Sequence, residues 1–179
     1  DYLGFNINDG EYKVMALASY GKGYLNSDFA EVVEDNNKDI KISSFDFYKS
    51  LERSYGKKFI EVFGSPYDKL EAFPEIGVTE FQRGVEIAYS AQNFLEEKVG
   101  AIFDKVNLQT GQRNFSLSGG VALNSKLIFA LSQKKYVDTL FVPPNPSDSG
   151  AAIGAGAFGA IKSGFKIKNA KSAYQGPTP

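Results

Sequence analysis

Two consecutive strand–loop–helix units constrain the fold of this chain more than any other feature. The first unit comprises a short apolar strand, a glycine pair and a helical pattern over 115–118, Gly119–Gly120 and 123–134. The second comprises a buried-type strand, a loop and an Ala- and Gly-rich helix over 139–142, 143–149 and 150–162. Such repetition is typical of an α/β sheet covered by helices. Because crossover connections are right-handed, we expect the two strands to be parallel neighbours covered by the helices.

Two helices are expected earlier in the chain. Apolar residues recur three, four or seven positions apart over 79–107, with charges between them, and this spacing predicts a long amphipathic helix. A shorter helix is expected over 10–20, since Gly21 stands where such a helix would end. This long helix is expected to help cover the sheet.

The intervening segments give weaker patterns. Two alternating segments, Glu31-Val32-Val33 and Ile40-Lys41-Ile42, flank the turn-forming Asp35-Asn36-Asn37 and predict a short hairpin within 28–44. A short helix is expected over 45–55. Glycine and proline punctuate an expected loop at Gly64-Ser65-Pro66 and Phe73-Pro74.

The composition excludes several classes of function. The formal net charge of -1 gives no basic field for nucleic acid, and no apolar run is long enough for a bilayer span, so neither nucleic acid nor membrane is expected as a partner. With no Cys and no His, thiol and imidazole chemistry are absent. The lack of Cys fits a reducing cytoplasm, where we expect the protein to act. The start Asp1-Tyr2-Leu3-Gly4-Phe5 suggests a chain that begins inside a longer protein.

The glycine pair after the first strand is the main candidate for a ligand site. Gly119 and Gly120 let backbone amides approach an anion, and the start of the next helix adds N–H donors and a partial positive charge. Asn124, one turn into that helix, can hydrogen-bond a ribose or a phosphate. The alternative is that the glycines only form a tight turn and that Asn124 is a surface amide.

Charged residues supply two further candidates. Asp148 follows the second strand, at the edge where open α/β sheets place their ligands, and is either a helix cap or a metal ligand. Because loops at this edge meet, Asp148 is expected to lie beside the glycine pair and Asn124. Glu11 and Lys13 either touch a nucleotide or are solvated helix charges. By themselves these residues predict a nucleotide- or phosphate-binding α/β protein.

Three motifs taken together carry a resemblance to a known family. The segments GEYKVMALASYGK, LSGGVALNSKL and VPPNPSDSGAAIGA, followed by YQGP, resemble the carbamoyltransferases that modify Nod factors and aminoglycoside or cephalosporin-type antibiotics. The family's large domain is similar to the tRNA threonylcarbamoyladenosine-forming enzyme and has a two-lobed actin/Hsp70-like (ribonuclease H-like) fold. The resemblance implies that this chain is mostly the second, nucleotide-binding lobe. Residues 1–173 would then be part of the large domain, and 174–179 would begin a linker to a carboxyl-terminal domain.

The resemblance also implies a mechanism. The large domain of the family binds a carbamoyl-adenylate, made with ATP and carbamoyl phosphate in the carboxyl-terminal domain, and passes the carbamoyl group to an acceptor hydroxyl. Gly119, Gly120 and Asn124 would line the phosphate and ribose of the adenylate. Asp148 matches an aspartate that, with two histidines of the first lobe, holds a divalent metal, usually iron. Because this chain has no His, it would supply one ligand of three and is not expected to catalyse transfer alone.

Two other functional classes remain open on the sequence. A different actin-like ATP-binding protein, such as a sugar kinase or an Hsp70-type ATPase, would also show a Gly-Gly turn after a strand. A non-catalytic regulatory or scaffold domain would keep the fold without the chemistry. Whichever holds, a separated lobe is expected to expose the apolar surface on which its partner lobe packs, and to self-associate through it.

Overall fold

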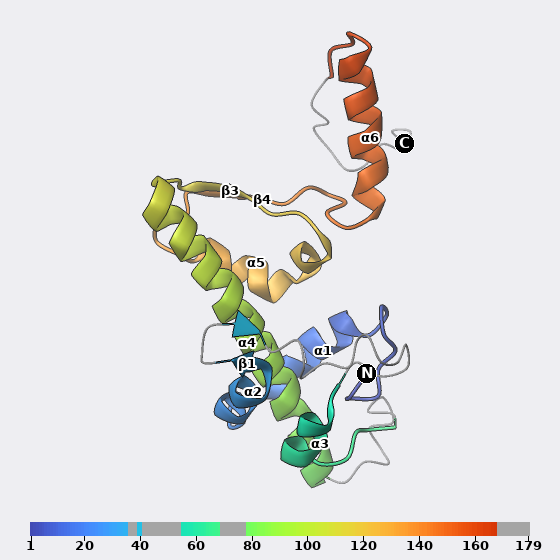
Figure 1. Ribbon diagram of the computed structural model, residues 1–179, viewed down its shortest axis with the longest axis vertical. Helices are drawn as coiled ribbons and strands as arrows, with labels where there is room; N and C mark the ends of the chain where they lie inside the picture. Colours follow the sequence, from blue (N-terminus) through green and yellow to red (C-terminus); the bar gives the residue numbers. More distant parts are fainter. Residues whose placement is uncertain (36–38, 41–54, 69–77, 168–179) are drawn as a thin grey trace, which may run out of the picture. The chain divides into compact units, whose positions relative to one another are not determined.

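A helix of 33 residues, α4 (Val78–Thr110), is the longest element of the structure and confirms the long helix expected over 79–107. The computed structural model describes residues 1–35, 39–40, 55–68 and 78–167. These form two units, Asp1–Ile102 and Phe103–Pro179, and α4 contributes its amino-terminal part to the first and its last turns to the second (Figure 1). Each unit has its own packing.

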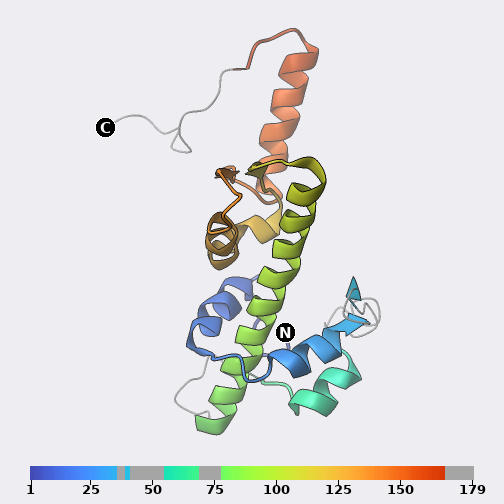
Figure 2. The ribbon, with the colours of Figure 1, turned by 90° about the vertical axis from the view of Figure 1, so that its left-hand side faces the viewer.

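The first unit consists of short helices arranged around the amino-terminal part of α4, as both ribbon views show (Figures 1 and 2). Its elements are α1 (Glu11–Leu17), the 3₁₀ turn η1 (Ala18–Tyr20), α2 (Asn26–Val33), the antiparallel pair β1 (Glu34–Asp35) and β2 (Asp39–Ile40), and α3 (Lys57–Phe63).

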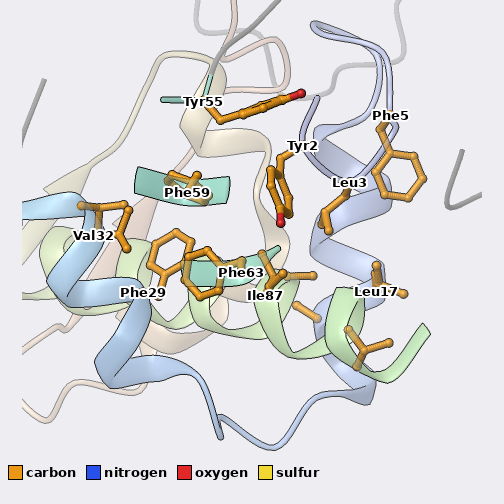
Figure 3. Packing of buried hydrophobic residues seen from close by; sticks show 14 residues of the cluster. Tyr2, Leu3, Phe5, Leu17, Phe29, Val32, Tyr55, Phe59, Phe63 and Ile87 are labelled. Atoms are coloured by element: carbon orange, nitrogen blue, oxygen red, sulfur yellow. The ribbon is translucent and has the colours of Figure 1, made fainter. Parts of the chain in front are cut away.

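Aromatic rings dominate the core of this unit (Figure 3). The ring of Phe29 on α2 lies 5.8 Å from that of Phe59 and 6.2 Å from that of Phe63, both on α3, and 5.8 Å from that of Phe94 on α4, measured between centroids. Such edge-on and tilted pairs add to the free energy gained from burial. Burial also raises the pKa of Tyr2 to about 12, so this hydroxyl stays protonated and donates a hydrogen bond to the carbonyl oxygen of Gly64 at 2.7 Å.

Several expectations for the first unit can be compared with the structure. The helix expected over 10–20 is confirmed as α1 followed by η1, and the hairpin is confirmed as β1 and β2. The assignment of Glu31-Val32-Val33 to a strand was wrong, because these residues form the last turn of α2. There Val32 and Val33 are fully buried, so tertiary packing overrides the β propensity of valine. Residues 45–54 and Phe73-Pro74 lie outside the described residues.

The second unit contains the two strand–loop–helix units in the expected order. Strands β3 (Asn114–Ser116) and β4 (Thr139–Phe141) are hydrogen-bonded in parallel, with Phe115 opposite Leu140, which confirms the expected pairing. The connection contains the 3₁₀ turn η3 (Gly120–Leu123) and α5 (Ser125–Ser132), and α6 (Ser149–Lys162) follows β4. The described residues are mostly helical, and the actin-like second lobe remains a prediction.

A small core fixes the strand pair to the helices beside it. Phe115 of β3 stacks on Phe103 of α4 with ring centroids 4.5 Å apart, and Leu127 and Leu131 of α5 are buried. One helix departs from the expected arrangement: α6 buries none of its residues, so the expectation that it covers the sheet was wrong. Its apolar side chains are exposed instead, among them Ile153, Phe158 and Ile161. No helix in the described ranges is long and apolar enough to cross a bilayer.

Candidate functional site

The loops that follow the two parallel strands meet at one backbone carbonyl. The N–H of Gly119 donates to the carbonyl oxygen of Pro146 at 2.6 Å, and the Ser118 hydroxyl donates to the same oxygen at 3.1 Å. Pro146 is itself buried. Farther along the same loop, the backbone of Gly150 lies so close to the carbonyl oxygen of Asn145 that a Cβ at residue 150 would collide with it. We call Ser118, Gly119 and Pro146 the loop clasp.

The glycine turn itself is open to solvent. Gly119 has φ +98°, a conformation that favours glycine, and a Cβ added to Gly119 or Gly120 would meet no atom within 4 Å. The helix expected over 123–134 is present as α5, which begins two residues later than expected, at Ser125, and the 3₁₀ turn η3 separates it from Gly119. The turn therefore offers an uncovered stretch of backbone rather than the amino terminus of a helix.

Asn124 lies at the junction between η3 and α5 and has a local structural role. It is the N-cap of α5, and its Oδ1 accepts a hydrogen bond from the N–H of Leu127 at 2.9 Å. An Asn at this position satisfies one of the unpaired donors of the first helical turn. Asn124 is thus neither one turn inside the helix nor a simple surface amide.

Asp148 stands immediately before α6, two residues after the clasp carbonyl of Pro146, with its side chain exposed. Its side chain makes no capping hydrogen bond, so the interpretation of Asp148 as a side-chain cap was wrong. Across the described ranges, no group of three or more Asp, Glu, His or Cys side chains is arranged to hold a metal ion.

Glu11 and Lys13 lie in the first unit, whereas the glycine turn and Asp148 lie in the second. Glu11 accepts a hydrogen bond from the N–H of Asn8 at 3.0 Å through Oε1. The Nζ of Lys13 stands 5.8 Å from the centroid of the Phe5 ring. These local contacts fit the interpretation of both residues as helix charges, and nucleotide contact by either remains a prediction.

The first unit contains a buried, hydrogen-bonded carboxylate that the sequence pattern did not reveal. Glu86 of α4 is 3% exposed, and it accepts the backbone N–H groups of Lys22, Gly23 and Tyr24 at 2.9, 2.8 and 3.0 Å. Gln82 donates a fourth hydrogen bond at 3.1 Å. Burial by itself would raise the pKa of Glu86, but these hydrogen bonds stabilise the charged form and lower it.

Glu86 explains part of the motif GEYKVMALASYGK in structural terms. The three amides belong to the loop that follows the motif's helix, and Gly21 in that loop packs so closely on Tyr89 of α4 that a Cβ would collide with it. A charged residue inside an amphipathic pattern looks like a solvated helix charge, and nothing in the apolar spacing of α4 distinguishes Glu86 from the other charges of the helix.

Comparison with known sequences identifies the family. The family described as "Carbamoyltransferase N-terminus" matches residues 1–157. The chain belongs to this carbamoyltransferase family. An uncharacterized protein of the cyanobacterium Synechocystis is 33% identical over 162 residues, which cover 86% of this chain and 25% of that protein.

Further relatives agree with this membership. The nodulation protein NolNO of Sinorhizobium fredii is 29% identical over 86% of this chain and 20% of its own length. Nodulation protein U of Rhizobium tropici is 43% identical over 68 residues, or 37% of this chain and 12% of its own length. The chain therefore spans about a quarter or less of the length of these curated relatives, and the resemblance seen in its motifs is confirmed.

Proposed function

We propose that this chain forms the nucleotide-binding part of an enzyme that transfers a carbamoyl group from carbamoyl-adenylate to an acceptor hydroxyl. The observation that carries the proposal is the loop clasp, which holds an uncovered glycine turn beside the loop of Asp148. Family membership favours this function over a sugar kinase or an Hsp70-type ATPase. In this proposal the complete protein also contains the first lobe and the carboxyl-terminal domain, and it acts in the cytoplasm.

The glycine turn suits the anionic part of the ligand. Backbone amides bind phosphate oxygens only where no side chain keeps them apart, and both glycines leave that space open. A carbamoyl mixed anhydride with AMP already carries a good leaving group, so the protein mainly has to orient it and stabilise developing charge. In this proposal Asn124 fixes the start of α5 and lines the ribose of the adenylate.

The metal-donor side chains of this chain decide how much of the family's metal site it can supply. Asp148 offers one exposed carboxylate, but the chain contains no His, and among the described residues no three donors form a site. One carboxylate by itself does not make a metal site. We propose only that Asp148 supplies one ligand when the other donors come from the rest of the protein.

Substitution at Gly120 tests the nucleotide site. Gly120 has no neighbour within 4 Å of an added Cβ and no left-handed φ, so Gly120→Ala and Gly120→Val should fold normally. We expect affinity for AMP, which is the product that remains in this site after carbamoyl transfer, to fall in that order in the complete protein. The loss should be about tenfold or more for Val, because the side chain keeps phosphate from the amides. Unchanged affinity, measured by titration calorimetry, would contradict the assignment.

Substitution at Asp148 tests the proposed ligand role separately. In the complete protein, Asp148→Ala should lower bound metal and abolish carbamoyl transfer while adenylate formation continues. Metal content is measured by elemental analysis, so the readout does not depend on activity. If both metal content and transfer persist, Asp148 is not a ligand. A wild-type protein that binds ATP but transfers carbamoyl to no hydroxyl acceptor would favour the non-catalytic regulatory reading.

A further inference from the structure

We propose that Ser118 is a positioning residue for nucleotide binding, acting through its hydrogen bond to the carbonyl of Pro146. The inference rests on the proposed nucleotide site and adds to it a residue that does not itself contact the ligand. Ser118 stands between β3 and Gly119, so its backbone leads directly into the turn that would meet the phosphate.

Packing does not hold the glycine turn. Gly119 and Gly120 are exposed, and apart from their chain neighbours no atom lies within 4 Å of the position that a Cβ would take on either. A turn with open space on its side-chain face depends on hydrogen bonds for its geometry. Within the turn, the N–H of Ala122 donates to the carbonyl oxygen of Gly119 at 3.0 Å.

The clasp connects this turn to a buried residue. The carbonyl of Pro146 receives both the Gly119 N–H and the Ser118 hydroxyl. Pro146 is buried and its ring restricts the backbone. The Ser118 hydroxyl therefore gives the exposed turn a second attachment to this buried residue.

The attachment orients the amides that would bind a ligand. The amide of Gly119 already donates to Pro146, so the turn would bind anions with its remaining amides, and their direction depends on the orientation of Gly119. Without the hydroxyl, only the Gly119 N–H attaches the turn to Pro146, and the turn samples conformations that do not bind. Affinity falls by the fraction of time spent in them.

The test compares Ser118→Ala, Ser118→Thr and a control, Ser116→Ala, in the complete protein with AMP as the probe. Ser116 is the last residue of β3, is exposed and makes no side-chain hydrogen bond to a described residue. We expect Ser118→Ala to raise the Kd for AMP about threefold to tenfold, with its melting temperature within about 2 °C of wild type. Ser118→Thr keeps the hydroxyl and should restore the Kd to within about twofold, and Ser116→Ala should match wild type.

The possible outcomes distinguish failure of the positioning role of Ser118 from failure of the proposed nucleotide site. If wild type does not bind AMP, the proposed nucleotide site fails and the positioning role with it. If Gly120→Val blocks AMP binding but Ser118→Ala binds like wild type, the site stands and the positioning role is wrong. A loss of affinity that Thr does not restore, or one accompanied by a large fall in melting temperature, would make Ser118 a structural residue and overturn the proposal.

Discussion

The substitution Glu86→Gln gives the sharpest test of the packing in the first unit. Oε1 of Glu86 accepts from Lys22 and Gln82, and Oε2 accepts from Gly23 and Tyr24. A glutamine has the same shape but carries an NH₂ in place of one oxygen. With its NH₂ at the Oε2 position, glutamine loses the two bonds from Gly23 and Tyr24. With its NH₂ at the Oε1 position it loses the bond from Lys22, whereas the amide of Gln82 can turn and accept from it.

The size of the effect follows from this count. A hydrogen bond to a charged group contributes roughly 1.5–3 kcal/mol to the free energy of unfolding. The bonds that remain in the glutamine variant are also weaker, because their acceptor is no longer charged. Water offsets part of the loss, since Lys22 and Tyr24 are exposed residues and solvent can reach their freed amides. We therefore expect Glu86→Gln to lower the free energy of unfolding by about 2–4 kcal/mol.

Urea unfolding of the 179-residue chain measures this change, followed by far-UV circular dichroism and by the fluorescence of its 10 tyrosines, since it has no tryptophan. Hydrogen exchange should show faster exchange at the amides of Lys22, Gly23 and Tyr24. The matched control is Glu97→Gln on the same helix, an exposed glutamate that accepts one bond from Asn93 at 2.8 Å.

The control should change stability by less than about 0.5 kcal/mol, as expected for a surface position. A loss below about 1 kcal/mol for Glu86→Gln, with unchanged exchange at residues 22–24, would refute the reasoning, because the carboxylate would then not hold this loop.

Three further predictions follow from the same structure. Since the pKa of Glu86 is lowered in the folded state, its stabilising contribution is complete above the ordinary value of 4.5 and is lost as pH falls through the folded value. The difference in unfolding free energy between wild type and Glu86→Gln should shrink below that pH. Gly21→Ala should destabilise by about 1–3 kcal/mol in the same urea assay, because its Cβ meets the Cβ of Tyr89, whereas Gly156→Ala on the open α6 should not destabilise. The chain should self-associate through α6, and Phe158→Glu, at a side chain 64% exposed, should shift sedimentation velocity profiles towards monomer; a monomeric wild type would contradict this.

Local patterns in the sequence predicted most helices and the paired strands. Backbone geometry sets the period of a helix and of a strand. The apolar spacing over 79–107 and within the two strand–loop–helix units was therefore sufficient to predict these elements. Glu31-Val32-Val33 failed because burial against the core, rather than the preference of valine for strands, decides that segment. Asn124 was predicted to lie one turn inside its helix, and its role as the N-cap became visible only with the true first residue of α5, Ser125.

The sequence by itself determined the family, the order of the elements and the absence of thiol and imidazole chemistry, because these depend on which residues are present and how they are spaced. Only the tertiary structure decided that Pro146 closes a clasp on Ser118 and Gly119, and that Glu86 is a buried acceptor rather than a surface charge. Both arrangements join groups that are 28 and more than 60 residues apart in the chain. No local pattern specifies such contacts, since they arise when separately formed elements pack and must satisfy each other's polar groups.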